Sequence, residues 1–284
     1  GQSTWAKPAV ASMFTGVWPP VHGATGWKHK LPENLASLPE VLQGAGYRTG
    51  AVVANPNIVR DFGFARGFDD FTRILERPSP QLNEGVFDWL ENADDRPFFL
   101  YVHTMDPHAP YRPPEPWLSR FAPRTSEMPT WTPSWRWPLE ALPFLLDLYD
   151  AEIAFNDDSF GALLRRLVDL DAYDDTLIVF TSDHGEMLGD HHLWRKTYAY
   201  EASSRVPFIL RPPAAFVAPR NVEVAPPVTV GWEDIMPTLL DAACEAIPDT
   251  VEGRSVLPLV RGQTDGWRPF YHGEHSPCYH PENA

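Results

Sequence analysis

The chain has 284 residues, of which 43% are hydrophobic and 21% are charged, and its 38 acidic residues outnumber 23 lysines and arginines to give a net charge of −15. A chain of this length can bury a large core without disulfide or metal staples, so the small stapled scaffolds are excluded. The acidic balance argues against nucleic acid or an anionic membrane as a partner. Because the longest apolar runs have the length of a strand, we expect no membrane-spanning segment.

The two cysteines, Cys244 and Cys278, are too few for a disulfide framework and lie in no metal-binding spacing. The redox compartment is therefore left open, and so is the localisation. The 31 prolines are spread through the chain without low-complexity repeats, which indicates a globular protein with stiff loops.

Strand-like apolar runs alternate with segments of helical spacing along most of the chain. The helical segments are residues 35–45, 81–93, 144–170 and part of 228–243. The strand-like runs are residues 47–54, 96–102, 176–181 and 206–210. These runs show little polar alternation, so we expect strands that are buried on both faces. The pattern predicts an α/β fold in which a mostly parallel central sheet is sandwiched by helices.

Residues 112–143 form a segment rich in proline and tryptophan, too broken for a long helix and too apolar for a free linker. Its tryptophans are Trp117, Trp131, Trp135 and Trp137. Their aromatic faces are suited to stack on sugar or aryl rings at the rim of a site, or to close a small hydrophobic core. The sequence leaves both interpretations open.

Polar side chains follow two of the predicted strands. Asp183 and His184 come directly after the run 176–181, and His108 follows the run 96–102. In open α/β sheets ligands bind beyond the carboxyl ends of the strands. A carboxylate and an imidazole at such a place are suitable ligands for a cation, although Asp-His-Gly alone is equally typical of a capped loop.

The stretch from Thr176 to Lys196, TLIVFTSDHGEMLGDHHLWRK, resembles the metal- and sulfate-binding stretch of the sulfatase family in the alkaline phosphatase superfamily. Residues 106–111 are similar to the Pro-His-x-Pro-Tyr element of that family, and residues 205–207, 237–241 and 253–255 to its later landmarks. The resemblance covers nearly the whole chain. It implies an alkaline phosphatase-like fold with one sulfatase-like catalytic domain over residues 1–284, which we expect to be incomplete at both ends, and with 112–143 as an insertion.

The resemblance also implies roles for individual residues. Asp183 and His184 would bind a divalent metal, while Lys196 and His108 would act as catalytic residues that contact the anionic ester. Calcium is the first expectation because an oxygen-rich site suits a hard cation, and zinc, manganese and magnesium remain alternatives. A cation and an ammonium group can neutralise the ester oxygens, and a histidine can protonate the leaving group. The implied partner is a small-molecule or glycan sulfate or phosphate ester.

The chain departs from the family at several positions. Ala6 stands where sulfatases carry the Cys or Ser that matures to formylglycine, so no formylglycine is expected, and a methyl group cannot attack an ester. Val10 replaces a supporting arginine. Asn55 and Asn57 stand where the family often has Lys-x-His. Either amide, with Asn55 as the first candidate, can donate a hydrogen bond to an ester oxygen, but neither brings a charge. The first metal-binding carboxylates of the family come from a strand that would precede Gly1, so at most half of the metal shell is expected here.

Three functions therefore stay open. The first is metal-dependent hydrolysis of sulfate esters. The second is hydrolysis of phosphodiesters or phosphonate esters on the same fold, which the changes at Ala6 and Asn55 favour. The third is recognition of an anion without cleavage, by a relative that has lost its nucleophile. The sequence does not identify the substrate or the oligomeric state.

Overall fold

The computed structural model describes residues 3–75, 77–124, 137–196, 198–216, 228–269 and 273. Three parallel strands form a sheet in the order β2-β1-β3, and two antiparallel pairs stand apart from it. The strands are β1 (Arg48–Val53), β2 (Asp70–Arg73), β3 (Phe98–His103), β4 (Ile178–Thr181), β5 (Met187–Leu188), β6 (Trp194–Arg195) and β7 (Phe208–Arg211). Strand β4 pairs with β7, and β5 pairs with β6. The expected α/β fold with a parallel central sheet is confirmed, and β4 and β7 form a separate antiparallel pair.

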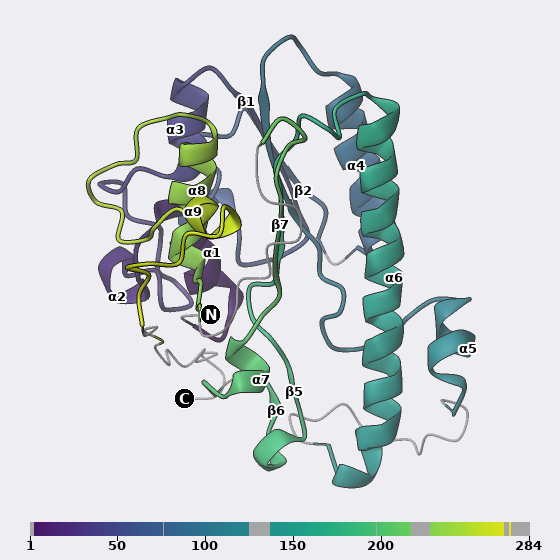
Figure 1. The fold of residues 1–284 in the computed structure, drawn as a ribbon. Helices are drawn as coiled ribbons and strands as arrows, with labels where there is room; N and C mark the ends of the chain where they lie inside the picture. Colours follow the sequence, from purple (N-terminus) through teal and green to yellow (C-terminus); the bar gives the residue numbers. More distant parts are fainter. Residues whose placement is uncertain are drawn as a thin grey trace.

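Helices cover both faces of the strands (Figure 1). The longer helices are α1 (Ala6–Thr15), α3 (Leu38–Gly44), α4 (Ser79–Glu91), α6 (Leu142–Asp169) and α8 (Ile235–Ala242). The short ones are α2 (Pro19–His22), α5 (Trp117–Phe121), α7 (Glu201–Ser204) and α9 (Leu257–Val260), with 3-10 turns η1 (Arg60–Phe62), η3 (Leu139–Ala141), η4 (Asp190–His192) and η5 (Trp232–Asp234). Among the described residues, no helix is both long and apolar enough to cross a membrane.

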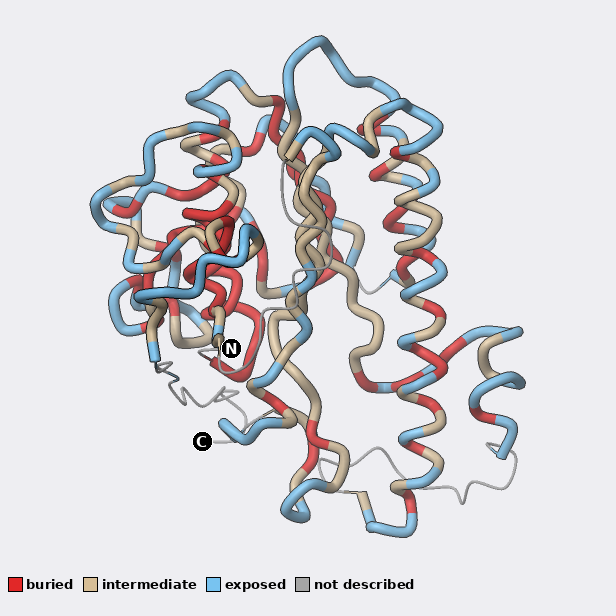
Figure 2. The backbone as a smooth tube through the Cα atoms, viewed as in Figure 1, coloured by how far each residue is buried: buried red, intermediate tan, exposed pale blue. Residues whose placement is uncertain are grey.

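Strand β3 joins two hydrophobic clusters. Phe99 and Tyr101 pack into the cluster built on α1, whereas Leu100 and Val102 pack with α4 and the end of α6. Alternate side chains of a strand point to opposite faces, so both faces are covered, as the lack of polar alternation predicted. Figure 2 shows the buried residues concentrated around α1 and along the inner side of the helices.

The described tryptophans of the segment 112–143 pack internally. The Trp117 ring lies 5.0 Å from that of Phe155 on α6, and the Trp137 ring lies 5.6 Å from that of Trp194. Both belong to one hydrophobic cluster on α6. For these two residues the core interpretation is the better one. Trp131 and Trp135 lie outside the described residues.

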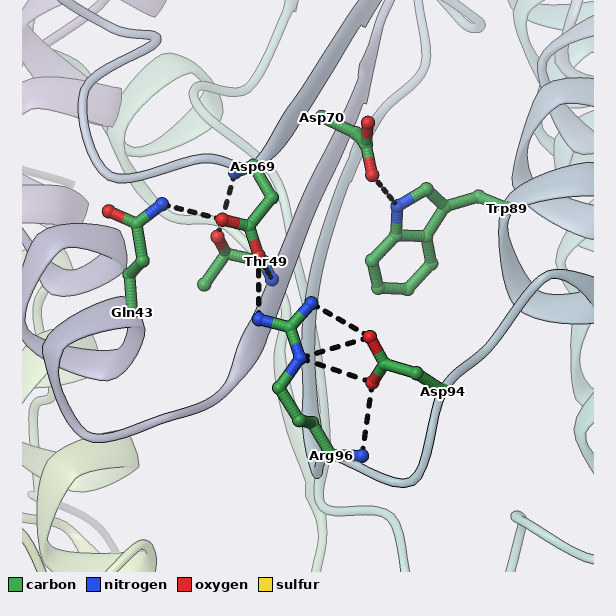
Figure 3. Close-up of polar contacts among 7 residues, drawn as sticks. All are labelled: Gln43, Thr49, Asp69, Asp70, Trp89, Asp94 and Arg96. Atoms are coloured by element: carbon green, nitrogen blue, oxygen red, sulfur yellow. Dashed lines mark hydrogen bonds and ion pairs between the residues drawn. The ribbon is translucent and has the colours of Figure 1, made fainter.

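The ends of the strands opposite the predicted site are tied together by Asp69 (Figure 3). Its carboxylate accepts hydrogen bonds from Gln43 of α3 at 2.7 Å and from the backbone N–H of Thr49 at 3.2 Å, and it pairs with Arg96 at 3.3 Å. Burial alone would raise the pKa of Asp69, but these three partners together hold it below its ordinary value. The contacts fix α3, β1 and β3 relative to one another, so β1 and β3 run in register toward the site.

A buried histidine joins α1 to the turn after α2. The Nδ1 atom of His22 accepts the N–H of Ala24 at 3.0 Å, so Nε2 carries the proton and faces the hydroxyl oxygen of Ser12 at 3.2 Å. The side chain is 2% exposed. Burial lowers the pKa of His22 from 6.5 to about 4, partly opposed by a hydrogen bond to Pro8.

This depressed pKa predicts a loss of stability in mild acid. The unfolded chain binds a proton at His22 below about pH 6.5, where His22 in the folded protein is still neutral. The contribution of His22 to the free energy of unfolding is therefore full above that pH and is lost as the pH falls toward 4. We expect a loss of about 3 kcal/mol in the free energy of unfolding from this residue across that range. Urea unfolding at pH 7 and pH 4.5 measures it. His22→Asn should flatten the pH dependence relative to wild type, and the exposed control His29→Asn should not; equal slopes in all three proteins would contradict the prediction.

Candidate functional site

Acidic and imidazole side chains converge where β3 and β4 end. Asp183, two residues beyond β4, places Oδ1 3.5 Å from Nε2 of His184 and Oδ2 3.7 Å from Nε2 of His103 at the end of β3. The turn is fixed because the N–H of Gly185 donates to the carbonyl of Ser203 at 2.8 Å. The indole N–H of Trp232 donates to the carbonyl of Ser182 at 3.1 Å. The sequence prediction that Asp183 and His184 lie beyond a strand end is therefore confirmed.

Both imidazoles direct an unprotonated Nε2 toward the carboxylate. In His184 the Nδ1 atom donates to the carbonyl of Gly185 at 2.8 Å, which leaves Nε2 as a lone pair. In His103 the amide nitrogen of Asn55 faces Nε2 at 3.4 Å and the Tyr101 hydroxyl lies 2.8 Å from Nδ1, so the network is consistent when Nδ1 carries the proton. The Nε2 lone pair of His184 then faces the carboxylate with no proton between them, whereas Nε2 of His103 accepts the amide N–H of Asn55.

The electrostatics keep these groups in the protonation states that a cation needs. Burial lowers the pKa of His184 to about 4, against the opposing charge of Asp183, and burial also lowers the pKa of His103. Burial would raise the pKa of Asp183, but His184, His103 and Lys196 outweigh it and hold the pKa below its ordinary value. At neutral pH the imidazoles are therefore neutral and the carboxylate is ionised.

The donors fit a divalent cation in type. Asp183 Oδ1 and His184 Nε2 lie 3.5 Å apart, and a carboxylate oxygen and a neutral imidazole nitrogen are both common ligands of divalent cations. No group of three or more such side chains closes around one point in the described parts of the chain. Asp183 and His184 thus form a fitting but partial shell, with His103 beside it.

A second pair, His108 and Lys196, meets nearby. Lys196 Nζ donates to Nε2 of His108 at 2.8 Å, while Nδ1 of His108 donates to the carbonyl of Ala109 at 2.7 Å. Burial, followed by the charge of Lys196, lowers the pKa of His108 to about 4. His108 and Lys196 are 88 positions apart in the sequence, and the fold brings them together by placing the loop after β3 against the β5–β6 hairpin.

Ala6 begins α1 and is 4% exposed. The next residue, Lys7, is fully buried: its Nζ donates to the carbonyls of Trp27 and His29, and it lies 3.4 Å from the centre of the Phe62 ring. A buried ammonium group is tolerated because carbonyl oxygens and an aromatic face replace water. These contacts anchor the first turn of α1, so the methyl group of Ala6 sits on a fixed backbone. Val10 packs in the core and offers no polar contact.

The hydroxyls of Ser3 and Thr4, which precede Ala6, are both buried. Asn55 is 6% exposed, and its carbonyl oxygen accepts the N–H of Asn57 at 2.9 Å, so its amide nitrogen is directed toward His103.

Other histidines of the motif do not join the site, whereas some side chains that the sequence did not assign do. His191 is exposed and stacks on Tyr200 with ring centres 4.2 Å apart, and His192 is exposed as well. Glu186 and Arg195 line the same small cavity as His108 and Lys196. The one available signal was the polar density of residues 186–196, which indicates a site but does not say which side chains turn inward.

A protein family model and several known proteins match most of this chain in sequence. The sulfatase family model matches residues 1–245. An arylsulfatase of Clostridium perfringens is 34% identical over 222 residues, which cover 69% of this chain and 44% of that protein. The multifunctional alkaline phosphatase superfamily protein PehA of Trinickia caryophylli is 29% identical over 295 residues, covering 90% of this chain and 53% of its own. The chain spans about half the length of these relatives.

Solved structures agree on the fold. A phosphonate monoester hydrolase of Agrobacterium radiobacter superposes with a TM-score of 0.76 at 21% identity, covering 93% of this chain and 69% of the other. A protein solved with its substrate D-glucosamine-2-N,6-O-disulfate gives a TM-score of 0.73 at 21% identity, covering 98% and 76%. These structures share the alkaline phosphatase-like fold. With the family match over residues 1–245, the chain belongs to the sulfatase family.

Proposed function

We propose that the protein is a metal-dependent hydrolase of sulfate esters whose substrate is a small-molecule or glycan sulfate. The observation that carries the proposal is the pairing of His108 with Lys196 at 2.8 Å, near the carboxylate of Asp183. The ammonium group offers a positive charge and a proton to the ester oxygens, and the unprotonated Nε2 of His108 can accept a proton at the same place. The arylsulfatase relative and the structural neighbour solved with a disulfated glucosamine support this substrate class.

Asp183 and His184 would hold the divalent metal, with calcium as the first expectation. When bound, the metal would neutralise negative charge on the oxygens of the ester. The protein's own contribution is to orient the ligands: the carbonyl of Gly185 fixes the tautomer of His184, and Trp232 and Ser203 hold the turn.

The His108–Lys196 pair supplies the proton for the leaving group. Lys196 donates to Nε2 of His108, so a proton shared on this bond can move to the departing oxygen when an ester occupies the site. Ala6 has no atom that can attack, so turnover requires water or a neighbouring hydroxyl as nucleophile.

Hydrolysis of phosphodiesters or phosphonate esters is the second candidate. Asn55 brings no charge to the strand end, which suits a less charged ester group, and phosphonate monoester hydrolases are among the similar solved structures. The third candidate is an anion-binding relative without activity, for which Ala6 is the observation.

One experiment separates the three. Turnover of an aryl sulfate and of an aryl phosphodiester is measured with full-length protein in calcium, magnesium, manganese and zinc, alongside binding of phenyl sulfate. Metal-dependent cleavage of the sulfate supports the proposal, and preference for the phosphodiester replaces it with the second candidate. Binding of phenyl sulfate without cleavage of either ester identifies the inactive relative.

The role of Lys196 has its own prediction. Lys196→Met removes the ammonium group and should weaken phenyl sulfate binding, measured by calorimetry, by about 100-fold, the upper range for a charged hydrogen bond. Lys30→Met, at an exposed lysine, is the matched control and should bind as wild type does. Unchanged affinity in Lys196→Met would place the anion elsewhere.

A further inference from the structure

A buried carboxyl group on α6 faces the loop that carries His108. Glu152 is 4% exposed, and its Oε1 atom accepts the backbone N–H of Arg112 at 2.5 Å. The Glu152 side chain also forms a hydrogen bond with that of Asp106, which lies two residues before His108. Glu152 therefore contacts the loop of residues 104–112 on both sides of His108.

Asp106 is the point at which this loop is fastened to two helices. Its Oδ2 atom accepts the backbone N–H of Ser79, at the start of α4, at 2.8 Å and lies 2.6 Å from the Ser79 hydroxyl oxygen. Asn156 is one turn beyond Glu152 on α6, so both side chains leave the same face of that helix. Its amide donates to the carbonyl of Asp106 at 3.1 Å, and its oxygen lies 2.7 Å from the Ser79 hydroxyl.

These oxygens need more hydrogens than the neutral side chains supply. Three pairs of oxygen-bearing groups are in hydrogen-bond contact: Ser79 with Asp106, Ser79 with Asn156, and Asp106 with Glu152. The Ser79 hydroxyl brings one hydrogen, and the Asn156 amide donates to a backbone carbonyl instead. Two ionised carboxylates can only accept, so the contact between Asp106 and Glu152 requires a proton on one of them.

The electrostatics agree with this proton count. Burial raises the pKa of Glu152 to about 7; the N–H of Arg112 opposes this rise, and the charge and hydrogen bond of Asp106 add to it. Among the described residues, Asp106 is the charged side chain that acts on Glu152, whereas Ser79 and Asn156 are neutral and the Arg112 side chain is exposed. A second negative charge would therefore stand directly against the first, and the two carboxylates would repel each other.

Ionisation of both groups would release one side of the loop. Asp106 keeps the two donors of Ser79 and stays in place. Glu152 would turn toward water, and in doing so it would give up the N–H of Arg112. His108 lies between these two anchors, and its Nε2 atom has to meet Lys196 for both side chains to hold an anion. A looser loop lowers the fraction of molecules in which the pair is assembled.

We propose that Glu152 is a positioning residue, which shares a proton with Asp106 and thereby fixes the loop 104–112 so that His108 meets Lys196. Loss of this proton in mildly alkaline solution loosens the loop and weakens anion binding at the pair. The proposal rests on the proposed function for the anion that the pair holds, and it adds a proton-dependent control of that site.

Calorimetric titration of full-length protein with phenyl sulfate at pH 6 and pH 8.5 tests the proposal. Wild type should bind more weakly at pH 8.5, by up to about 30-fold, because a group with a pKa of about 7 is almost fully ionised there. In Glu152→Gln an amide N–H permanently replaces the shared proton. The loss of affinity between the two pH values should therefore be about tenfold larger in wild type than in Glu152→Gln. Titration of other groups, Lys196 included, acts on both proteins alike. Asp158→Asn, at an exposed carboxylate of the same helix, is the matched control and should follow wild type.

Hydrogen exchange gives a second readout that does not need the anion. Exchange of the backbone amides of residues 105–112 is compared between wild type and Glu152→Gln at the same pH, so the intrinsic pH dependence of exchange cancels. The two proteins should exchange alike at pH 6. At pH 8.5 wild type should exchange about tenfold faster, because the N–H of Arg112 is then released.

The outcomes separate this proposal from the proposed function. Equal pH profiles of binding and of exchange in wild type and Glu152→Gln would overturn the positioning role and leave the anion site as it stands. If wild type binds phenyl sulfate at neither pH, the proposed function fails, and hydrogen exchange alone decides whether the shared proton fixes the loop. Unfolding curves identify a variant that does not fold. Asp106→Asn, which also places an amide between the two groups, is then the deciding variant and should show the same loss of pH dependence.

Discussion

The variant Asp183→Ala is expected to lose metal-dependent turnover of an aryl sulfate, with a fall in kcat/KM of at least about 10³-fold. The reason lies in the surroundings of the carboxylate. The carboxylate oxygens of Asp183 lie 3.5 and 3.7 Å from the Nε2 atoms of His184 and His103, and the charges around it keep it ionised. Its removal leaves two neutral imidazoles, which hold a calcium ion poorly because a hard cation prefers oxygen.

A second readout does not depend on turnover. Calcium at about 100 times its Kd should stabilise wild type by about 2.7 kcal/mol, visible as a rise in Tm, and should leave the Tm of Asp183→Ala unchanged. Asp175→Ala, at an exposed aspartate before β4, is the matched control and should respond to calcium as wild type does. A calcium-induced rise in Tm that survives in Asp183→Ala would show that the cation binds at another place.

The parts of the fold that the sequence predicts well are those with a local signal. The long helix expected at 144–170 is α6 (Leu142–Asp169), and the run 47–54 is β1 (Arg48–Val53). Helix α1 was not predicted, because all ten of its residues are buried and it has no polar face to reveal the helical period. Strand β2 was missed for the opposite reason, since only Phe71 of its four residues is buried.

The site shows a similar division. Asp183 and His184 follow a strand directly, so their place could be derived from local sequence. The contact of His108 with Lys196 depends on how the loop after β3 meets the β5–β6 hairpin, and here only the family resemblance connected the two. Glu186 could not be assigned, because neither spacing nor composition says which side chains of the polar run 186–196 turn inward.

The largest effect on stability is expected away from the site. Glu233 and Asp234 are fully buried, and Arg268 pairs with both, through Nη1 to Glu233 at 2.5 Å and through Nη2 to Asp234. Asp234 also accepts the N–H groups of Gly231 and Arg254, each at 2.8 Å. Burial and the neighbouring Asp234 raise the pKa of Glu233, and Arg268 opposes them. One guanidinium thus compensates two buried carboxyl groups.

Arg268→Met should therefore lower the free energy of unfolding by about 4 kcal/mol, the cost of leaving a buried charge without its partner. The loss should shrink on acidification from pH 7 to pH 5, because carboxyl groups whose folded pKa lies above the unfolded value destabilise the fold as the pH rises through that window. Urea unfolding at both pH values measures it. Arg205→Met is the control, since the exposed pair of Arg205 with Glu201 contributes at most about 0.5 kcal/mol.

The consequence of that variant reaches the site through a single turn. Glu233 and Asp234 follow Trp232 in η5. The Trp232 side chain packs in the hydrophobic cluster of α1, and its indole N–H donates a hydrogen bond to the carbonyl of Ser182. Loosening η5 frees both the turn that carries Asp183 and the helix that begins at Ala6. Arg268→Met should accordingly weaken calcium binding under conditions where the protein is still folded, whereas Arg205→Met should not. A variant that is destabilised but keeps the calcium affinity of wild type would confine the role of Arg268 to stability.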